Sequence, residues 1–217
     1  MPHHSLPITH RGSTRICVIE GDGIGHEVVP VAVEAMRAVA PDLEFISAEA
    51  GFECFQRRGA AIPEETWAAI EGSDAILFGA ISAPSEEVPG YEPVILTLRQ
   101  RVRLFANLRP TVSHTLPGLR PGVDLVIVRE NSEGLYVRAE WGDGESAVAL
   151  RVITKRASER IARVAFELAR KRKRKVTVVH KANVMRKTCG LFRAAALEVA
   201  RGYPDVEVEE MLVDAMA

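Results

Sequence analysis

Short apolar runs alternate along most of the chain with stretches in which apolar residues recur at helical spacing. A short apolar run bounded by turn-forming residues is typical of a buried strand. Such runs predict strands at residues 15–20, 43–48, 75–78, 124–128, 176–179 and 206–213. The helical spacing predicts helices at residues 28–39, 63–71, 158–169 and 191–200. Either Thr154 or Ser158 could cap the third helix. The alternation indicates an α/β fold with a largely parallel sheet and helices on both faces.

Residues 136–151 depart from this alternation. A Gly142-Asp143-Gly144 turn lies between two extended stretches, which predicts a β-hairpin. The hairpin would present unpaired strand edges and an exposed Trp141, and both features favour burial against another protein surface. A second subunit could provide that surface, and so could the hairpin's own domain if the hairpin folds back onto it.

Composition narrows the class of protein. With 217 residues, 47% of them hydrophobic, and a formal net charge of -1, the chain can bury a sizeable core and has no overall charge bias toward nucleic acid or anionic membranes. Residues 1–14 lack the apolar stretch of a secretory signal and are predicted to be a flexible leader. The cysteines Cys17, Cys54 and Cys189 lie far apart, which is typical of free thiols in a cytoplasmic protein. These features predict a globular protein of the cytoplasm.

Two motifs have simple structural interpretations. The turn from Gly21 to Gly25 has the spacing G-x-G-x-G and not G-x-G-x-x-G, so a tight turn between strand and helix is favoured over a dinucleotide fingerprint. The basic run at residues 169–175 follows a predicted helix and contains no interleaved aromatic residue. Because cations complement the carboxyl end of a helix dipole, we predict a solvated helix end there and not a nucleic-acid site.

Three arginines stand out by their position. Arg99 follows Leu98, Arg109 precedes Pro110 just after an apolar stretch, and Arg129 ends a predicted strand. Ligands bind at the carboxyl ends of strands in open parallel sheets, and the planar guanidinium group binds carboxylates through paired hydrogen bonds. A solvated surface position is the alternative for each arginine. The set indicates a small polycarboxylic acid as ligand.

Tyr136, Lys181 and Asp214 also lie where predicted strands end. A tyrosine that faces a lysine can pass protons in both directions. A lysine or aspartate at a strand end is placed to act on a ligand, although a loop ion pair explains the same position.

Several motifs together resemble the β-decarboxylating dehydrogenases, a family that includes isocitrate, homoisocitrate and 3-isopropylmalate dehydrogenases. In order, they are Glu20-Gly21-Asp22-Gly23-Ile24-Gly25, Leu98-Arg99, Ala106-Asn107-Leu108-Arg109-Pro110, Glu130-Asn131-Ser132-Glu133-Gly134-Leu135-Tyr136, His180-Lys181-Ala182-Asn183 and Val213-Asp214. The resemblance runs from about Arg15 to the last residue. It implies a two-domain isopropylmalate-dehydrogenase-like fold, distinct from the Rossmann fold, with a first domain at 15–104, a second at 105–217 and a protruding dimerisation arm at about 137–152.

The resemblance also implies roles for individual residues. Arg99, Arg109 and Arg129 match substrate-carboxylate arginines, Tyr136 the general acid and Lys181 the general base. The remaining matches are Asp214 as a ligand of Mg²⁺ or Mn²⁺, Leu96 as a substrate contact, and Ile81, Ser82 and Asn183 as contacts of NAD. In this family the lysine and the aspartate come from the partner subunit, so the resemblance implies a homodimer or a higher homo-oligomer.

The substrate is less sharply indicated. The form of residues 130–136 is that of isocitrate and homoisocitrate enzymes, whereas Pro93, Ile95 and Leu96 form an apolar segment that suits an isopropyl group or a longer flexible acid. Likeness over the whole chain favours NAD-linked oxidative decarboxylation of homoisocitrate, with isocitrate as a second substrate, in lysine biosynthesis through 2-aminoadipate. The alternative is a 3-isopropylmalate dehydrogenase of leucine biosynthesis.

The carboxyl end departs from the family pattern. Two further metal-binding aspartates and the loop that holds the adenosine of the cofactor have no counterpart in the 217 residues, which leaves the choice between NAD and NADP open. Two hypotheses follow. Either the chain is the amino-terminal portion of a dehydrogenase, or it is an inactive chain that acts as a dimerisation or regulatory subunit on a longer relative.

Overall fold

The computed structural model describes residues 13–114, 118 and 120–217, so nearly all of the predicted leader lies outside the described residues. The chain separates into two compact units between Thr97 and Leu98. This boundary lies within helix α4 (Val94–Arg101), whereas the family resemblance puts the domain boundary after residue 104. No helix in the described part of the chain is long and apolar enough to cross a membrane.

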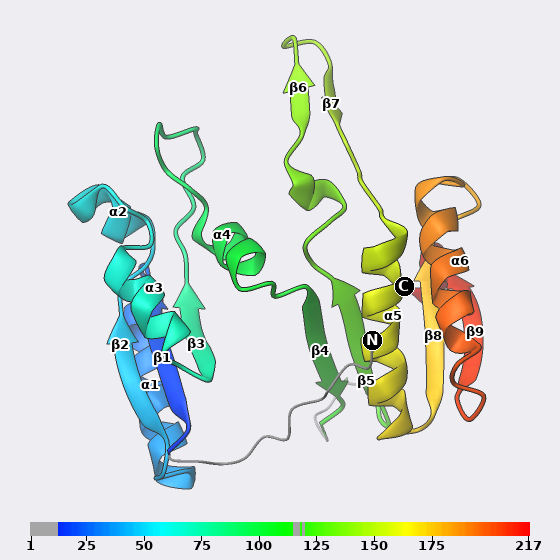
Figure 1. Cartoon of the computed structure of the whole chain (residues 1–217), viewed down its shortest axis with the longest axis horizontal. Helices are drawn as coiled ribbons and strands as arrows, with labels where there is room; N and C mark the ends of the chain where they lie inside the picture. The colour runs from blue at the N-terminus through cyan, green and yellow to red at the C-terminus, as the bar shows by residue number, and fades with distance from the viewer. Residues whose placement is uncertain (1–12, 115–117, 119) are drawn as a thin grey trace, which may run out of the picture. The chain divides into compact units, whose positions relative to one another are not determined.

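The first unit contains a three-stranded parallel sheet in the order β2-β1-β3 (Figure 1). Its strands are β1 (Arg15–Gly21), β2 (Glu44–Ala48) and β3 (Ala75–Ala80). Its helices before α4 are α1 (Gly25–Val39), α2 (Phe52–Arg58) and α3 (Glu64–Glu71). Cys17 and Ile19 are fully buried on one face of β1, and Ile16 and Val18 are buried on the other, where Val29 of α1 packs against them. The central strand is therefore covered on both faces.

The second unit contains three two-stranded ladders. They are the antiparallel pair β4 (Ala106–Val112) and β5 (Asp124–Glu130), the antiparallel pair β6 (Glu140–Gly142) and β7 (Ala147–Ala149), and the parallel pair β8 (Lys175–His180) and β9 (Glu207–Leu212). The helices are α5 (Lys155–Arg170), α6 (Thr188–Ala200) and the short α7 (Val213–Met216). The predicted parallel pairing is confirmed for β1 to β3 and for β8 with β9, but β4 and β5 run antiparallel.

The core of the second unit centres on Phe166 of α5. This side chain is fully buried and stacks on Tyr203, with 5.0 Å between ring centroids. Small residues surround it, since Ala162, Ala169 and Ala196 belong to the same cluster and let α5 and α6 approach closely. Helix α5 lies across both β5 and β8 (Figure 1), and a cavity of about 450 Å³ opens between these two strands.

Thr154 is the N-cap of α5, one of the two predicted alternatives. Its Oγ1 accepts a hydrogen bond of 3.2 Å from the Ala157 N–H, while Ser158 Oγ donates to the Thr154 carbonyl at 2.7 Å. The helix therefore starts a few residues earlier than its apolar spacing predicts.

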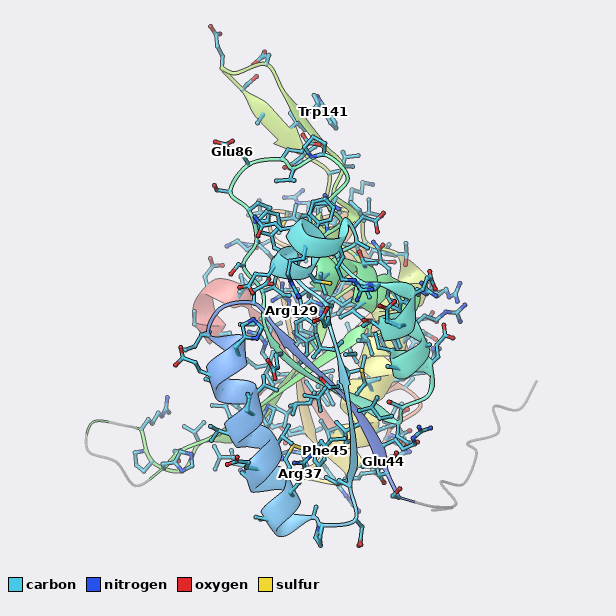
Figure 2. The ribbon with its side chains drawn as sticks, turned by 90° about the vertical axis from the view of Figure 1, so that its left-hand side faces the viewer. Arg37, Glu44, Phe45, Glu86, Arg129 and Trp141 are labelled. Atoms are coloured by element: carbon cyan, nitrogen blue, oxygen red, sulfur yellow. The ribbon has the colours of Figure 1, made fainter. Side chains whose placement is uncertain are left out.

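The predicted hairpin is formed by β6 and β7. Asp143 Oδ1 accepts from the N–H groups of Glu145 and Ser146 at 3.0 and 2.8 Å, which stabilises the turn. Residues 140–150 are all exposed, and Trp141 retains 59% of its accessible surface (Figures 1 and 2). The hairpin therefore does not fold back onto its own unit. Cover by a second subunit stays a prediction.

Candidate active site

The β4-β5 ladder brings two of the predicted arginines to one face. Asn107 pairs directly with Arg129, and Arg109 pairs with Ile127 two positions along. Residues two apart on a strand point to the same face of the sheet, so Arg109 lies on the face of Asn107. Directly paired residues on neighbouring strands also share a face, so Arg129 lies there as well. Arg109 Nε donates to Asn107 Oδ1 at 3.3 Å, which steers its guanidinium toward the Asn107-Arg129 pair.

Tyr136 lies close to two guanidinium groups. The chain turns at Gly134, which has φ of 74°, and a single 3₁₀ turn at Leu135–Val137 carries the phenol back toward β5. Arg129 Nη2 donates to Tyr136 Oη at 2.8 Å. The Cζ atoms of Arg129 and Arg99 lie 5.5 and 5.6 Å from the centroid of the tyrosine ring. Because arginine only donates, the tyrosine oxygen accepts this bond and its own hydrogen stays available for another acceptor.

Asn131 links Arg99 of α4 to the same group. With the side-chain amide oriented by its hydrogen-bond pattern, its oxygen accepts from Arg99 Nε at 2.7 Å and from Nη2 at 3.3 Å. Asn131 is 5% exposed, one of few buried polar residues of the described chain. Sequence reasoning did not single it out as a site residue, although its place between Arg129 and Tyr136 in the family motif is a usable signal. The structure thus brings together Arg99, Asn131, Arg129 and Tyr136, which we call the arginine-tyrosine cluster.

Lys181 and Asp214 form a second group in the same unit. Lys181 follows β8 and Asp214 lies in the first turn of α7, and their side chains form an ion pair between Nζ and Oδ2. The hydrogen bond from Lys181 lowers the pKa of Asp214 below its ordinary value. This contact is the loop ion pair that the sequence left open as an alternative.

A metal site is not complete in the part of the chain that the structure describes. No group of three or more histidine, cysteine, aspartate or glutamate side chains there could hold a metal ion. Asp214 alone offers too few oxygen ligands for Mg²⁺ or Mn²⁺, which need several. Its role as a metal ligand stays a prediction.

The glycine turn of the first unit is a tight packing turn, as its spacing predicts. A Cβ on Gly21, which has φ of 81°, would lie 1.8 Å from the Ala80 carbonyl oxygen. The N–H groups of the turn are taken within the unit: Asp22 N donates to the Ala80 carbonyl at 2.8 Å and Gly23 N to Glu53 at 2.9 Å. They are not directed at a phosphate, unlike those of a dinucleotide cradle.

The predicted cofactor contacts Ile81 and Ser82 follow β3, and Asn183 is exposed in the turn after Lys181. The Ser82 N–H donates to Asp22 Oδ2 at 2.9 Å, so its backbone is held while its side chain is exposed. Leu96 is half-buried in α4, three residues before Arg99, so the two project from the same side of that helix. The roles of these four residues stay predictions.

The basic run is largely neutralised by neighbouring carboxylates. Arg170 pairs with Asp205, Arg172 with Asp124, and Lys175 with Glu207 and Glu209. A nucleic-acid site needs cations that are free to reach phosphates. These ion pairs favour the predicted solvated helix end.

A histidine between two carboxylates lies beside the glycine turn. His26 Nδ1 contacts Glu20 at 2.8 Å and Nε2 contacts Glu53 at 3.1 Å, and these hydrogen bonds raise the pKa of His26 above its ordinary value. The pKa of Glu53 is lowered, mainly by the hydrogen bond from the Gly23 N–H and next by the one from His26. The two contacts of His26 tie the start of α1 to the end of β1 and to α2.

We expect the stability of the first unit to fall as pH rises above neutrality. The contribution of His26 is fully present below its unfolded pKa of about 6.5 and is lost as pH rises through its raised folded pKa. Urea unfolding followed by the fluorescence of buried Trp67 should give a higher midpoint at about pH 6 than at about pH 8.5. His26→Gln should remove most of this difference, and exposed His114→Gln in the second unit should preserve it. An equal pH dependence in wild type and His26→Gln would contradict the assignment.

Comparisons with known proteins agree with the geometry. A family model described as isocitrate/isopropylmalate dehydrogenase matches residues 15–217. The chain is 52% identical over 201 residues to an isocitrate/homoisocitrate dehydrogenase of Thermus thermophilus, covering 92% of this chain and 60% of the relative. It is 45% identical over 203 residues to the 3-isopropylmalate dehydrogenase of Archaeoglobus fulgidus, covering 93% of this chain and 60% of the relative.

A solved structure gives the same result for the fold. The isocitrate dehydrogenase of Methylococcus capsulatus matches with a TM-score of 0.85 and 37% identity, over 94% of this chain and 61% of that one. The chain thus spans about 60% of the length of the relatives it matches. The predicted fold and the predicted resemblance are both confirmed, because the matched region begins at β1 and includes every motif that carries the resemblance. The chain belongs to the isocitrate/isopropylmalate dehydrogenase family.

Proposed function

We propose that this chain carries the substrate-binding residues of an NAD-dependent and metal-dependent β-decarboxylating dehydrogenase. The proposed reaction is oxidative decarboxylation of a 2-hydroxy tricarboxylic acid, homoisocitrate with isocitrate as a second substrate, in lysine biosynthesis. The observation that carries this proposal is the arginine-tyrosine cluster, in which Arg129 donates to Tyr136 Oη at 2.8 Å and Arg99 lies over the same ring.

The charges of the cluster suit a polycarboxylic acid. Arg99 and Arg129 converge on Tyr136, and Arg109 shares the face of Arg129. Cationic donors in fixed positions hold carboxylates through charge-assisted hydrogen bonds. Asn131 fixes Arg99 through Nε and Nη2, which leaves Nη1 of that guanidinium for a ligand. Several separate carboxylates on one ligand would engage these groups together.

Proton transfer would be divided between Tyr136 and Lys181. Tyr136 can donate because Arg129 uses its oxygen and not its hydrogen, which suits a general acid that protonates the carbon left by decarboxylation. Lys181 would act as the general base that takes the proton of the substrate hydroxyl. It must first leave its ion pair with Asp214, so a metal that competes for this carboxylate would help to free it.

The proposed cofactors are NAD, as hydride acceptor, and Mg²⁺ or Mn²⁺. Ile81, Ser82 and Asn183 are the residues proposed to contact NAD. Asp214 is the proposed metal ligand, and the other ligands would have to come from elsewhere in a longer polypeptide or from a second subunit. A homodimer, joined through the hairpin at about residues 137–152 and located in the cytoplasm, is part of the same proposal.

Two alternatives have specific support. Half-buried Leu96, next to Ile95, favours a 3-isopropylmalate dehydrogenase of leucine biosynthesis, the activity in the name of the Archaeoglobus fulgidus relative. The exposed apolar residues of the hairpin, Trp141, Val148 and Leu150, favour a chain without catalysis that docks on a longer relative as a dimerisation or regulatory subunit.

Ligand binding tests the proposal on the chain itself. Calorimetric titration with homoisocitrate, isocitrate and 3-isopropylmalate, each with Mg²⁺, should detect binding of at least one tricarboxylate. Arg129→Ala should weaken it by about 10- to 100-fold, since a hydrogen bond to a charged group contributes about 1.5–3 kcal/mol. Exposed Arg156→Ala on α5 is the matched control. Stronger binding of 3-isopropylmalate would favour the first alternative.

Two results would contradict the proposal. If none of the three acids binds, or if Arg129→Ala binds as tightly as wild type, the arginine-tyrosine cluster is not a substrate site. Absence of turnover with NAD, Mg²⁺ and any of the three acids, together with tight association with a longer relative, would favour the regulatory alternative.

A further inference from the structure

Arg160 of α5 reaches the loop that follows β5, although no motif of the family resemblance includes it. Its Nη2 donates to Glu130 Oε1 at 2.8 Å and to Ser132 Oγ at 2.6 Å. Its guanidinium lies over the ring of Phe105, with Cζ 4.3 Å from the ring centroid. One side chain of α5 therefore contacts residues on both sides of Asn131 in the sequence.

Glu130 gathers the loop around its carboxylate. Besides Arg160, it accepts from Ser132 Oγ at 2.6 Å, from the Ser132 N–H at 2.9 Å and from the Glu133 N–H at 2.8 Å. Burial acts to raise the pKa of Glu130, but the hydrogen bonds from Ser132, Arg160 and Glu133 outweigh it and lower the pKa below its ordinary value. The group is therefore a carboxylate at neutral pH, and Arg160 is the cation that balances it.

The same loop is tied to α5 at a second point. Glu133 accepts from the Thr154 N–H at 2.8 Å and from Thr154 Oγ1 at 2.6 Å, at the N-cap of the helix. The Asn131 N–H donates to the Phe105 carbonyl at 2.9 Å, so the backbone of Asn131 is held to the residue on which Arg160 stacks. These hydrogen bonds hold the backbone on either side of the Asn131 amide, which accepts from Arg99.

We propose that Arg160 is a positioning residue for the arginine-tyrosine cluster: through Glu130, Ser132 and Phe105 it holds the loop at 130–133 so that Asn131 faces Arg99 and Tyr136 faces Arg129. This role rests on the proposed function, because it concerns the site proposed to bind the substrate carboxylates. Arg160 itself would not touch the ligand.

Arginine suits this place better than lysine. Its planar group can stack on Phe105 while one nitrogen bridges Glu130 and Ser132, whereas an ammonium has no plane to stack. Arg160 Nε is buried and has no hydrogen-bond partner among the described residues, so the contact depends on Nη2. Arg160→Lys keeps the positive charge and a hydrogen-bonding nitrogen and should act as a partial rescue. Arg160→Met keeps most of the side-chain length but removes the charge and the hydrogen-bond donors.

The test measures the geometry of Arg99 and the affinity for a ligand separately. In ¹H–¹⁵N spectra of the 217-residue chain, the Arg99 Nε–Hε signal should be sharp and slow to exchange, because Nε donates to Asn131 at 2.7 Å. Arg160→Met should broaden or shift this signal and weaken isocitrate binding in the presence of Mg²⁺ by about tenfold. Arg160→Lys should restore part of both effects. Arg163→Met, one turn away on α5 and paired with Glu159, is the matched control and should change neither.

The outcomes separate positioning from mere stabilisation. If Arg160→Met lowers the unfolding midpoint but leaves the Arg99 signal and the isocitrate affinity unchanged, the proposal is wrong. If Arg160→Met does not fold, Ser132→Ala carries the test, because it removes the hydroxyl that bridges Arg160 and Glu130; an unchanged Arg99 signal and affinity in that variant would also overturn it. If wild type binds none of the three acids, the proposed function fails on its own, and the Arg99 signal still decides the role of Arg160.

Discussion

Replacing Tyr136 with phenylalanine, in a polypeptide extended to the length of its relatives, would reduce overall turnover by about 10²- to 10⁴-fold, the usual contribution of general acid–base catalysis. The substitution keeps the ring beside Arg99 and Arg129 and removes only the hydroxyl, to which Arg129 donates at 2.8 Å. Substrate binding should therefore change much less than turnover. Turnover falls because the variant lacks the hydroxyl that would protonate the carbon.

Steady-state NADH formation with homoisocitrate, isocitrate and 3-isopropylmalate measures this effect, and calorimetry with each acid measures binding. Tyr203→Phe is the matched control, because Tyr203 Oη donates to Glu167 at 2.8 Å and its ring packs in the core of the same unit. That variant should turn over at the wild-type rate. Unchanged kinetics in Tyr136→Phe would exclude Tyr136 as the acid, whatever the control shows.

Asp22→Ala should lower the unfolding free energy of the first unit by about 3 kcal/mol, because three part-buried hydrogen bonds would lose their acceptor and the N–H groups would be left unsatisfied. Asp22 is 1% exposed. Its carboxylate accepts from the N–H groups of Phe52, Glu53 and Ser82, each at 2.9 Å. It therefore joins the amino end of α2 to the segment after β3, where the proposed NAD contacts Ile81 and Ser82 lie.

Urea unfolding followed by Trp67 fluorescence measures this loss, because Trp67 is 6% exposed and lies in the same unit. Exposed Asp42→Ala is the control for removal of an aspartate. Asp22→Asn should cost less than Asp22→Ala, since an amide oxygen can still accept from part of the set. A stability equal to that of Asp42→Ala would show that the three hydrogen bonds contribute little.

The apolar pattern predicted most elements because burial selects it directly. Strands β1, β2, β3, β5, β8 and β9 lie within one or two residues of the predicted bounds, as do the carboxyl ends of the predicted helices. Helices α2, α4 and the four-residue α7, and strand β4, were missed. Helix α2 is too short to establish a helical period, and α4 opens with three consecutive apolar residues in place of helical spacing. Strand β4 contains Arg109 and Pro110, residue types that weigh against a strand.

The antiparallel pairing of β4 with β5 also escaped prediction, for a different reason. An alternation of strands and helices favours parallel pairing, but β4 and β5 follow one another with no helix between them in the described chain. That pairing matters for the site, because its register puts Arg109 on the face of Arg129. Register depends on the turn and on which face of each strand is buried, and neither was assigned for β4, because β4 was not predicted.

Family motifs predicted the chemistry, since residue types that can bind carboxylates or carry protons are recognised wherever they stand in the chain. Arg99, Arg129 and Tyr136 were identified in this way, and the structure brings them together. Their mutual orientation came from folding, because the contacts of Asn131 with Arg99 and of Glu130 with Arg160 join segments at least 30 residues apart. Short-range sequence patterns record what each segment buries, whereas the meeting of distant polar groups depends on how the segments pack.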